Sequence, residues 1–339
     1  MYLIDIENDE RAQEAYLWAM GVDASICSVE YSYADASFRR YFRLSTSDGR
    51  SYIVMDAPPE REKVVEFLNV AKLLDNREVR VPLVYESSIS RGFILLEDLG
   101  CQSFYDVVSH SCTKEKRLLL YRQALHILRK FSGIACDNVL PVYNQDLLKK
   151  ELLLFVEWYL PYISYDESVV WNDLFESVIK DVASHHNVFV HRDFHSKNMI
   201  INNQDIAVID FQDAVVGSTY YDLVSLLRDV YVLVSKDDEF YLLRQYYLLL
   251  SYKHESFELF YRQYVFMGLQ RHLKILGIFV RLFKRDGKSH YLPYLSRVLW
   301  RVSAAVSDLF GPNSKYKDAL SYCFDRQTQK LRSDGVNSV

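Results

Sequence analysis

The spacing of hydrophobic residues along the chain changes near residue 100. Before that point, short runs of alternating apolar and polar residues predict strands, and two amphipathic stretches predict helices. We expect strands at 38–44, 51–56, 83–86 and 92–97, and helices at 10–20 and 60–75. Ser47-Asp48-Gly49 supplies the turn of the first hairpin, and Pro58-Pro59 opens the second helix. These elements predict a small, mostly antiparallel sheet with one inserted helix.

After residue 100, apolar residues recur every three or four positions, which predicts a helical region. We expect helices at 103–109, 114–132, 145–160, 172–186, 219–235, 239–252, 256–284 and 290–309. Residues 188–210 break this pattern with short apolar runs that are typical of strands. The polar tail beyond Ser321 is expected to fray. The sequence therefore predicts an α+β protein with a β-rich lobe at 1–99 and a helical lobe at 100–339.

Composition narrows the functional classes. The chain has 339 residues, half of them hydrophobic, which suits a protein of about two lobes with large cores. A net charge of −5 gives no sign of nucleic-acid binding. Five scattered cysteines without a CxxC pair argue against disulfides and zinc. We expect neither a signal peptide nor a membrane span, because the first ten residues are acidic and no run of about 18 apolar residues occurs. We expect a cytoplasmic enzyme, monomeric, with neither a membrane nor a nucleic acid as partner.

The candidate chemistry lies in His191-Arg192-Asp193-Phe194-His195-Ser196-Lys197-Asn198 and in Ile209-Asp210-Phe211-Gln212. Phosphoryl transfer from Mg-ATP uses one carboxylate to take the acceptor's proton, and an amide oxygen with a second carboxylate to hold the metal. Asp193, Asn198 and Asp210 stand in that order on loops between apolar segments. This pattern predicts a kinase-like bilobal fold with ATP and Mg²⁺, although a His-Arg-Asp triplet alone would mean little.

The acceptor is expected to be a small molecule. Only eleven residues separate Asp210 from Asp222, which leaves no room for the segment on which a protein kinase seats a peptide. Residues 271–301 hold eight Lys or Arg against one acid, Asp286. Most of these cations are expected on a solvated helix face. Arg271 and Lys274 are the candidates for attracting an anionic acceptor, and their charge argues against a polycationic antibiotic.

Two aromatic residues, Trp158 and Tyr159, are candidates for stacking on a sugar ring. Trp158 follows Phe155 at helical spacing and precedes Tyr159, and such a group packs in a core more often than it binds a sugar. Both interpretations stay open. His191 is expected to orient the catalytic loop, whereas His195 and His272 are expected to be structural.

Several segments together resemble a known family. The segments are 35–43, 55–59, 95–100, 151–159, 191–198, 210–214, 221–226 and 270–274 through 285–288. They resemble the aminoglycoside phosphotransferase and choline kinase family, distant relatives of protein kinases. Asp-Ala-Ser-Phe-Arg-Arg-Tyr at 35–41 and Gln-Arg-His-Leu-Lys at 270–274 are most similar to the bacterial anomeric kinases of N-acetylmuramic acid and N-acetylglucosamine in cell-wall recycling.

The resemblance implies roles for further residues. Residues 35–38 would cover the phosphates, with Ser37 and Phe38 at the turn. Glu97, Asp98 and Leu99 would form the hinge that pairs with adenine, and Asp222 would steady the catalytic loop. The product would be a sugar 1-phosphate, which links the enzyme to a sugar-1-phosphate nucleotidyltransferase.

The sequence departs from the kinase pattern at the lysine that usually binds the ATP phosphates. The strand at 51–56 contains no lysine, although kinases usually place a phosphate-binding lysine there and pair it with a helix glutamate. Arg40, Arg43 and Lys63 are the candidate replacements, with Glu62 or Glu66 as the helix acid. Two alternatives stay open, namely a kinase of this fold acting on another sugar, an amino alcohol or an aminoglycoside, and a regulatory pseudokinase that binds nucleotide.

Overall fold

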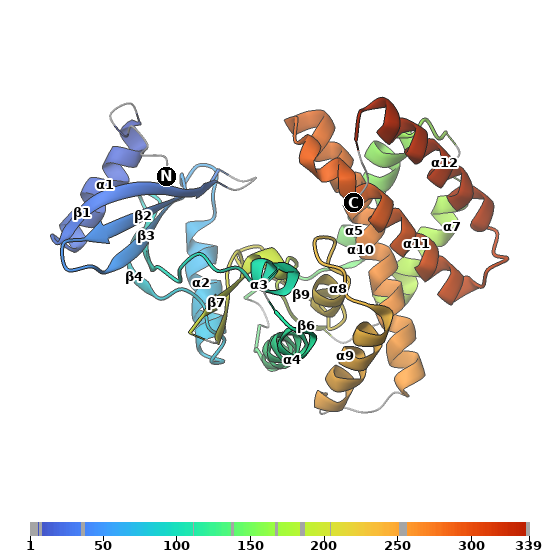
Figure 1. Cartoon of the computed structure of the whole chain (residues 1–339), viewed down its shortest axis with the longest axis horizontal. Helices are drawn as coiled ribbons and strands as arrows, with labels where there is room; N and C mark the ends of the chain where they lie inside the picture. Colours follow the sequence, from blue (N-terminus) through green and yellow to red (C-terminus); the bar gives the residue numbers. More distant parts are fainter. Residues whose placement is uncertain are drawn as a thin grey trace. The chain divides into compact units, whose positions relative to one another are not determined.

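The computed structural model describes residues 6, 9–34, 38–110, 112–136, 139–166, 169–183, 187–203, 205–250 and 256–336. The chain divides into two units. The first contains Met1–Phe104 and Lys197–Asp213, and the second contains Tyr105–Ser196 and Ala214–Val339. Each unit is discontinuous in sequence, because the chain leaves the first unit and returns to it (Figure 1). The lobe boundary proposed between residues 99 and 100 stays a prediction.

A five-stranded sheet forms the body of the first unit. Its strands are β1 (Ile26–Ala34), β2 (Arg40–Thr46), β3 (Ser51–Asp56), β4 (Val84–Ser88) and β5 (Phe93–Glu97). They lie in the order β1-β2-β3-β5-β4, and every neighbouring pair is antiparallel. The predicted hairpin and the two later strands are confirmed. β1 was not predicted, although it pairs along most of its length with β2.

The two faces of this sheet differ because successive side chains of a strand point to opposite sides. On one face, apolar residues of β2, β3 and β5 form a core with α1 (Glu10–Val22). That core contains Ala12, Ala15, Ala19, Phe42, Leu44, Tyr52, Val54, Phe93 and Leu95. The side chains of Tyr41, Arg43 and Met55 therefore belong to the opposite face.

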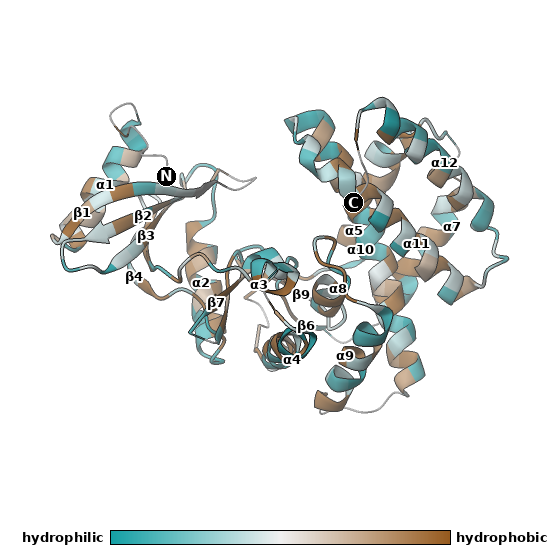
Figure 2. Cartoon of the chain, in the orientation of Figure 1, coloured by the Kyte–Doolittle hydropathy of each residue, from teal (hydrophilic) through white to brown (hydrophobic). Residues whose placement is uncertain are grey.

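The first unit also contains a helix and a hairpin that position one of the candidate residues. Helix α2 (Val64–Asp75) carries mostly hydrophobic residues along its length (Figure 2). Strands β7 (Met199–Asn202) and β8 (Asp205–Val208) form an antiparallel hairpin. Phe211 follows this hairpin and stacks on Phe67 of α2, with ring centroids 4.8 Å apart. This stack fixes the residue that follows Asp210 against α2.

The second unit is built around the long helix α10 (Phe257–Asp286), which packs against α5, α7, α8, α9 and α11. Its other helices are α3 (Phe104–His110, whose first residue belongs to the first unit), α4 (Lys114–Phe131), α5 (Gln145–Leu154), α6 (Leu160–Tyr162), α7 (Val169–Val182), α8 (Tyr221–Leu227), α9 (Lys236–Leu249), α11 (Leu295–Phe310) and α12 (Lys317–Ser333). Strands β6 (Asn187–Val190) and β9 (Val215–Ser218) pair antiparallel.

Two helix predictions were wrong for tertiary reasons. The helix expected over 219–235 ends at Leu227, and Asp229 then accepts hydrogen bonds from the backbone N–H groups of Ser196 and Tyr231. The polar tail is not frayed, because α12 buries Leu320, Cys323 and Leu331.

The helix expected over 145–160 contains a π-helical turn. This turn, η2 (Phe155–Tyr159), connects α5 to α6. It lies against Gly277 of α10, where a Cβ atom added to the glycine would stand 2.3 Å from the carbonyl carbon of Leu154. Glycine is thus required at 277 because the two backbones touch there.

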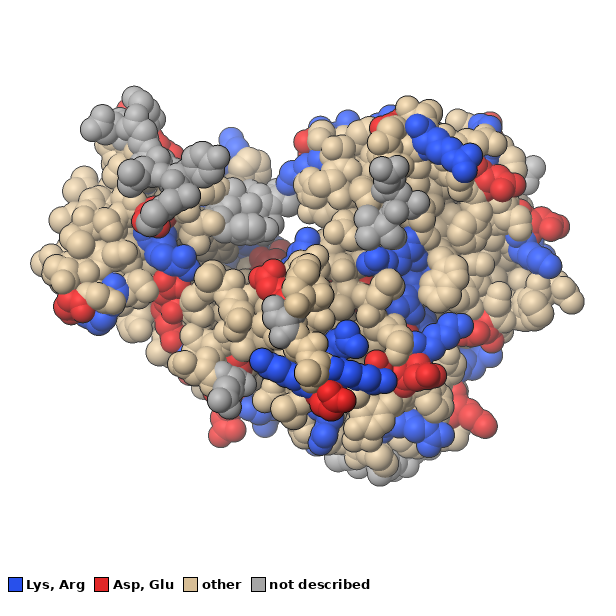
Figure 3. All heavy atoms as spheres, in the orientation of Figure 1, with Lys and Arg blue, Asp and Glu red and all other residues tan. Residues whose placement is uncertain are grey.

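Two surface properties of the described residues bear on possible partners. None of their helices has an apolar stretch long enough to cross a bilayer. On the face drawn in Figure 3, Lys and Arg side chains are interspersed with Asp and Glu and do not cover one continuous area.

Candidate active site

The loop that carries Asp193 follows β6 and is anchored from α8. The Asp222 carboxylate is 3% exposed and accepts hydrogen bonds from the backbone N–H of His191 at 2.6 Å and of Arg192 at 3.1 Å. The Asp193 N–H in turn donates to Nδ1 of His191 at 3.2 Å. Arg192 has a φ of +76°, a left-handed conformation that costs a non-glycine residue about 1–3 kcal/mol and is typical of functional sites. Asp222 thus contacts the loop, and the orienting roles of His191 and Asp222 stay predictions.

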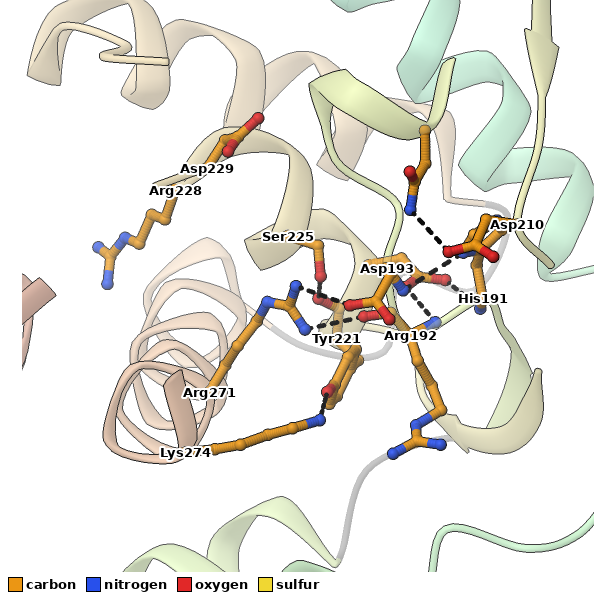
Figure 4. Close-up of polar contacts among 12 residues, drawn as sticks. His191, Arg192, Asp193, Asp210, Tyr221, Ser225, Arg228, Asp229, Arg271 and Lys274 are labelled. Carbon is orange, nitrogen blue, oxygen red and sulfur yellow. Dashed lines mark hydrogen bonds and ion pairs between the residues drawn. The ribbon is translucent and has the colours of Figure 1, made fainter. Parts of the chain in front are cut away.

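Arg271 of α10 contacts the same loop. Its guanidinium donates to the carbonyl oxygen of Arg192 at 2.8 Å and lies 3.5 Å from the Asp193 carboxylate (Figure 4). The Asp193 side chain is 52% exposed, whereas that of Arg271 is 7% exposed. Partial desolvation by the surrounding protein would raise the pKa of Asp193. The positive charges of Arg271 and Lys274 outweigh this effect, so the pKa is lowered. Asp193 is therefore an accessible carboxylate that stays ionised.

A buried carboxylate that the sequence did not single out connects these cations. Glu151 of α5 is 5% exposed and accepts hydrogen bonds from Arg192 at 2.8 Å and from Lys274 at 2.9 Å. The Tyr143 hydroxyl also donates to it. Burial raises the pKa of Glu151, but Lys274 and Arg192 outweigh it, so the pKa falls below its usual range. Its ionised form thus holds α5, α10 and the catalytic loop together.

Lys274 is also fixed on its other side. Its ammonium group donates to the Tyr221 hydroxyl at 2.8 Å, and the Arg271 guanidinium lies over the ring of the same tyrosine at 5.0 Å (Figure 4). Both side chains predicted to contact substrate are therefore buried and paired within the second unit. Their contact with an acceptor stays a prediction.

The two predicted metal ligands, Asn198 and Asp210, lie close together. Asn198 and Asp210, both in the first unit, face each other with Nδ2 and Oδ2 3.4 Å apart, and Gln212 donates to the same carboxylate at 3.0 Å. Asp210 has a left-handed φ of +63°. Among the described residues no group of three His, Cys, Asp or Glu could enclose a metal. An amide and a carboxylate suit Mg²⁺, which keeps several waters and phosphate oxygens as ligands.

The cations predicted to meet the nucleotide have different surroundings. Arg40 is held between Asp9 and Asp56, on the α1 side of the sheet. Arg43 is paired with Asp98, its Nε lying 2.7 Å from the carboxylate. Arg39, which the sequence did not single out, lies 3.1 Å from Asp210 and 3.8 Å from Glu62.

The remaining nucleotide-binding candidates lie in the first unit. Ser37 lies outside the described residues, and Phe38 is exposed, with its N–H donating to Glu62 at 2.9 Å. In the predicted hinge, Glu97 pairs with Arg80, and the Leu99 carbonyl accepts a hydrogen bond from Asn202 at 3.0 Å. These contacts hold the hinge between β5 and β7, and its role stays a prediction.

Trp158 is partly exposed on the π-helical turn η2, whereas its neighbours Phe155 and Tyr159 are fully buried. The core interpretation thus applies to the neighbours. π-Helical turns occur frequently at functional sites, so sugar contact by Trp158 stays a prediction.

Comparison with known proteins agrees with this arrangement. A model described as the phosphotransferase enzyme family matches residues 33–250. An N-acetylmuramate/N-acetylglucosamine kinase of Neisseria meningitidis is 36% identical, over 82% of this chain and 86% of its own. A kinase with the same name from Pseudomonas putida is 34% identical, over 88% of this chain and 93% of its own.

Solved structures show the same fold at low sequence identity. The ADP-bound aminoglycoside phosphotransferase APH(2'')-Ib superposes with a TM-score of 0.59 at 17% identity, over 88% of this chain and 99% of its own. A choline/ethanolamine kinase family protein of Mesorhizobium loti gives 0.62 at 14% identity, over 95% and 99%. The predicted α+β protein-kinase-like fold is confirmed. The chain belongs to the phosphotransferase enzyme family and is a kinase homologous to the N-acetylmuramate/N-acetylglucosamine kinases.

Proposed function

We propose that this protein transfers the γ-phosphoryl group of ATP to the anomeric hydroxyl of N-acetylmuramate, N-acetylglucosamine or both. The names of relatives at 34% and 36% identity support these acceptors. The observation that carries the proposal is the state of Asp193, which is exposed, ionised and held by a loop anchored at Asp222 and Arg271. A pseudokinase has no need of such a carboxylate.

Asp193 would act as the base. It would accept the proton of the anomeric hydroxyl as the bond from that oxygen to the γ-phosphorus forms and the bond to the β-phosphate breaks, releasing ADP. A carboxylate beside Arg271 is a weak base before the transfer, so it would take the proton late, once the oxygen has become acidic. Arg271 and His191 would keep the Asp193 carboxylate in place while the proton is transferred to it.

Asn198 and Asp210 would hold Mg²⁺, with Gln212 supporting the Asp210 carboxylate. The Asn198 amide must turn over to present its oxygen, because its nitrogen faces Asp210 in this structure. The metal would neutralise charge on the phosphates. Glu97, Asp98 and Leu99 would hold adenine, and Phe38 the phosphate-covering turn.

Arg271, Lys274 and Trp158 are the proposed acceptor contacts. N-acetylmuramate carries a lactyl carboxylate that N-acetylglucosamine lacks, so a cation that contacts it would favour the first sugar. ATP as the phosphoryl donor makes the cytoplasm the expected compartment. A sugar-1-phosphate nucleotidyltransferase would be the functional partner that consumes the product.

The test combines purified protein, ATP and MgCl₂ with a panel of acceptors. ADP release is followed with N-acetylmuramate, N-acetylglucosamine, choline, kanamycin and the methyl glycoside of N-acetylglucosamine, whose anomeric oxygen is blocked. We expect turnover with the two free sugars and none with the glycoside. A ³¹P spectrum coupled to the anomeric proton should identify a sugar 1-phosphate. Turnover with the methyl glycoside would refute anomeric phosphorylation.

A second test addresses the base. Asp193→Asn should lower kcat by about 10²–10⁴-fold, because the proton acceptor is lost. Binding of the fluorescent analogue mant-ATP should stay within a few-fold of the wild type. An Asp193→Asn enzyme with a near-normal kcat would exclude the role given to Asp193.

A further inference from the structure

We propose that Arg39 is the cation that binds the ATP phosphates, in place of the strand lysine that this chain lacks. The inference rests on the proposed use of ATP and assigns one more residue to that reaction. It starts from the sequence of β3, Ser51-Tyr52-Ile53-Val54-Met55-Asp56, which contains no lysine.

The neighbouring arginines are paired elsewhere. Arg40 lies on the α1 face of the sheet, where Asp9 and the fully buried Asp56 hold its guanidinium. Arg43 is bound through both Nε and Nη2 to Asp98 in the predicted hinge. Lys63 is exposed at the start of α2. Arg40 and Arg43 are therefore held by carboxylates other than Asp210, and Lys63 is exposed to solvent.

Alternation along β2 directs Arg39, the residue just before the strand, to the face of the sheet opposite α1. Tyr41 pairs with Met55, and Arg43 pairs with Ile53, on the face of the sheet opposite α1. Arg39 precedes Tyr41 by two residues, so alternation along the strand directs it to that same face. A long side chain from the start of β2 can thus replace a lysine on β3.

Glu62 supplies the partner that kinases use to position this cation. It lies just before α2, and its carboxylate is 3.8 Å from the Arg39 guanidinium and accepts the N–H of the adjacent Phe38 at 2.9 Å. The same acid therefore positions both the arginine side chain and the backbone beside the predicted phosphate-covering turn. The prediction of Glu62 as helix acid gains its missing partner.

Asp210 places Arg39 at the proposed metal site as well. The Arg39 guanidinium, 6% exposed, lies 3.1 Å from the Asp210 carboxylate. The arginine thus neutralises the acid that would receive Mg²⁺. When nucleotide binds, the Arg39 guanidinium would leave the Asp210 carboxylate and contact phosphate oxygens, while its ion pair with Glu62 would remain.

The choice of arginine has a chemical consequence. A guanidinium is planar and binds two oxygens of one phosphate at once, whereas an ammonium acts as a point charge on a shorter stem. Lysine at position 39 should therefore restore charge without restoring the bidentate contact or the reach to Glu62.

The experiment compares Arg39→Gln, Arg39→Lys and the matched control Arg50→Gln. Arg50 is 53% exposed at the far end of the same hairpin and pairs with Asp48. Mant-ATP binding is measured with MgCl₂ and again with EDTA, followed by kcat, the KM for ATP and the KM for the sugar. Melting temperatures report whether each variant is folded.

We expect Arg39→Gln to weaken mant-ATP binding and raise the KM for ATP by about 10- to 100-fold, as for a lost charge-assisted hydrogen bond. The sugar KM should change less than threefold. Arg39→Lys should fall between Gln and wild type, and Arg50→Gln should match wild type. Adding Glu62→Gln to Arg39→Gln should cause little further loss, because the charge of Glu62 acts on the arginine and the glutamine oxygen can still accept the Phe38 N–H.

The outcomes separate this inference from the proposed function. If wild type neither binds mant-ATP nor turns over, the proposed function fails. If wild type is active and folded Arg39→Gln keeps its affinity for ATP, Arg39 is not the phosphate cation. A loss of affinity in Arg43→Gln with none in Arg39→Gln would overturn the assignment in favour of Arg43.

Discussion

Replacing Glu151 by glutamine should destabilise the second unit and slow catalysis together. Gln keeps the shape of Glu151 but removes a charge that two cations and a tyrosine hydroxyl share in a 5% exposed position. Lys274 would then stay buried, and Arg192 half-buried, with too little negative charge, and the new amide would direct N–H donors toward them. Removal of one partner from a buried ion pair costs about 3–5 kcal/mol.

Glutamine retains one accepting oxygen, so we expect a loss of about 3 kcal/mol in the free energy of unfolding. For a unit of this size that corresponds to a melting temperature lower by about 6–12 °C. The catalytic effect follows from Arg192, which precedes Asp193 and loses its anchor. We expect kcat to fall more strongly than the KM for ATP rises.

Urea unfolding followed by circular dichroism and steady-state kinetics would measure both effects. Glu157→Gln is the matched control, because Glu157 is exposed on the adjacent π-helical turn. In a double-mutant cycle, Glu151→Gln with Lys274→Met should cost less than the sum of the single changes, since the second change removes an unpaired cation. An unfolding free energy of Glu151→Gln within about 1 kcal/mol of wild type would refute the role given to this network.

Three further changes test the packing and electrostatics of the second unit. Gly277→Ala should destabilise by about 3 kcal/mol or more, because its Cβ would meet the Leu154 backbone at 2.3 Å. Gly268→Ala, whose Cβ would meet side-chain atoms of Arg228 rather than backbone, should cost less in the same thermal melt. Burial, with the charges of Arg228 and Arg301, lowers the pKa of His272 to about 3 from 6.5. Its contribution to stability is therefore present above pH 6.5 and is lost as the pH falls. His272→Gln should reduce the slope of the unfolding free energy against pH, measured with urea between pH 6 and 4, by about 1.4 kcal/mol per pH unit. Burial raises the pKa of Asp222 to about 7 from 3.8, so its contribution to stability is present at acid pH and is lost as the pH rises through 7. The unfolding free energy of Asp222→Asn should therefore rise relative to that of wild type between pH 5 and 8. A difference between the two proteins that does not change with pH would contradict the raised pKa.

The sequence predicted those features that depend on local spacing. Alternation gave the β2–β3 hairpin, and three- and four-residue periodicity gave the long helix α10. The α12 helix was missed because its buried residues, among them Cys323 and Leu331, are too sparse among polar neighbours to mark a core face. α8 was predicted too long because its terminus depends on hydrogen bonds of Asp229 to a loop distant in sequence.

The candidate site shows the same limit. Asp193, Asn198 and Asp210 were found because their order and spacing are set by the chemistry of phosphoryl transfer. Arg39 was passed over for its neighbour Arg40, since only the strand register decides which of two adjacent arginines points to which face. Glu151 was not singled out, because its partners Arg192, Lys274 and Gln270 come from distant parts of the chain.

The discontinuity of the first unit has a consequence during synthesis. Domains generally fold as the chain leaves the ribosome, from the N-terminus onward. The sheet of Met1–Phe104 emerges early, but its partner segment Lys197–Asp213 follows only after the whole of Tyr105–Ser196 has been translated. A nascent chain halted before that point would expose the Phe67 side of α2, which Phe211 later covers. Completion of the first unit is thereby delayed until residues 105–196 of the second unit have been made.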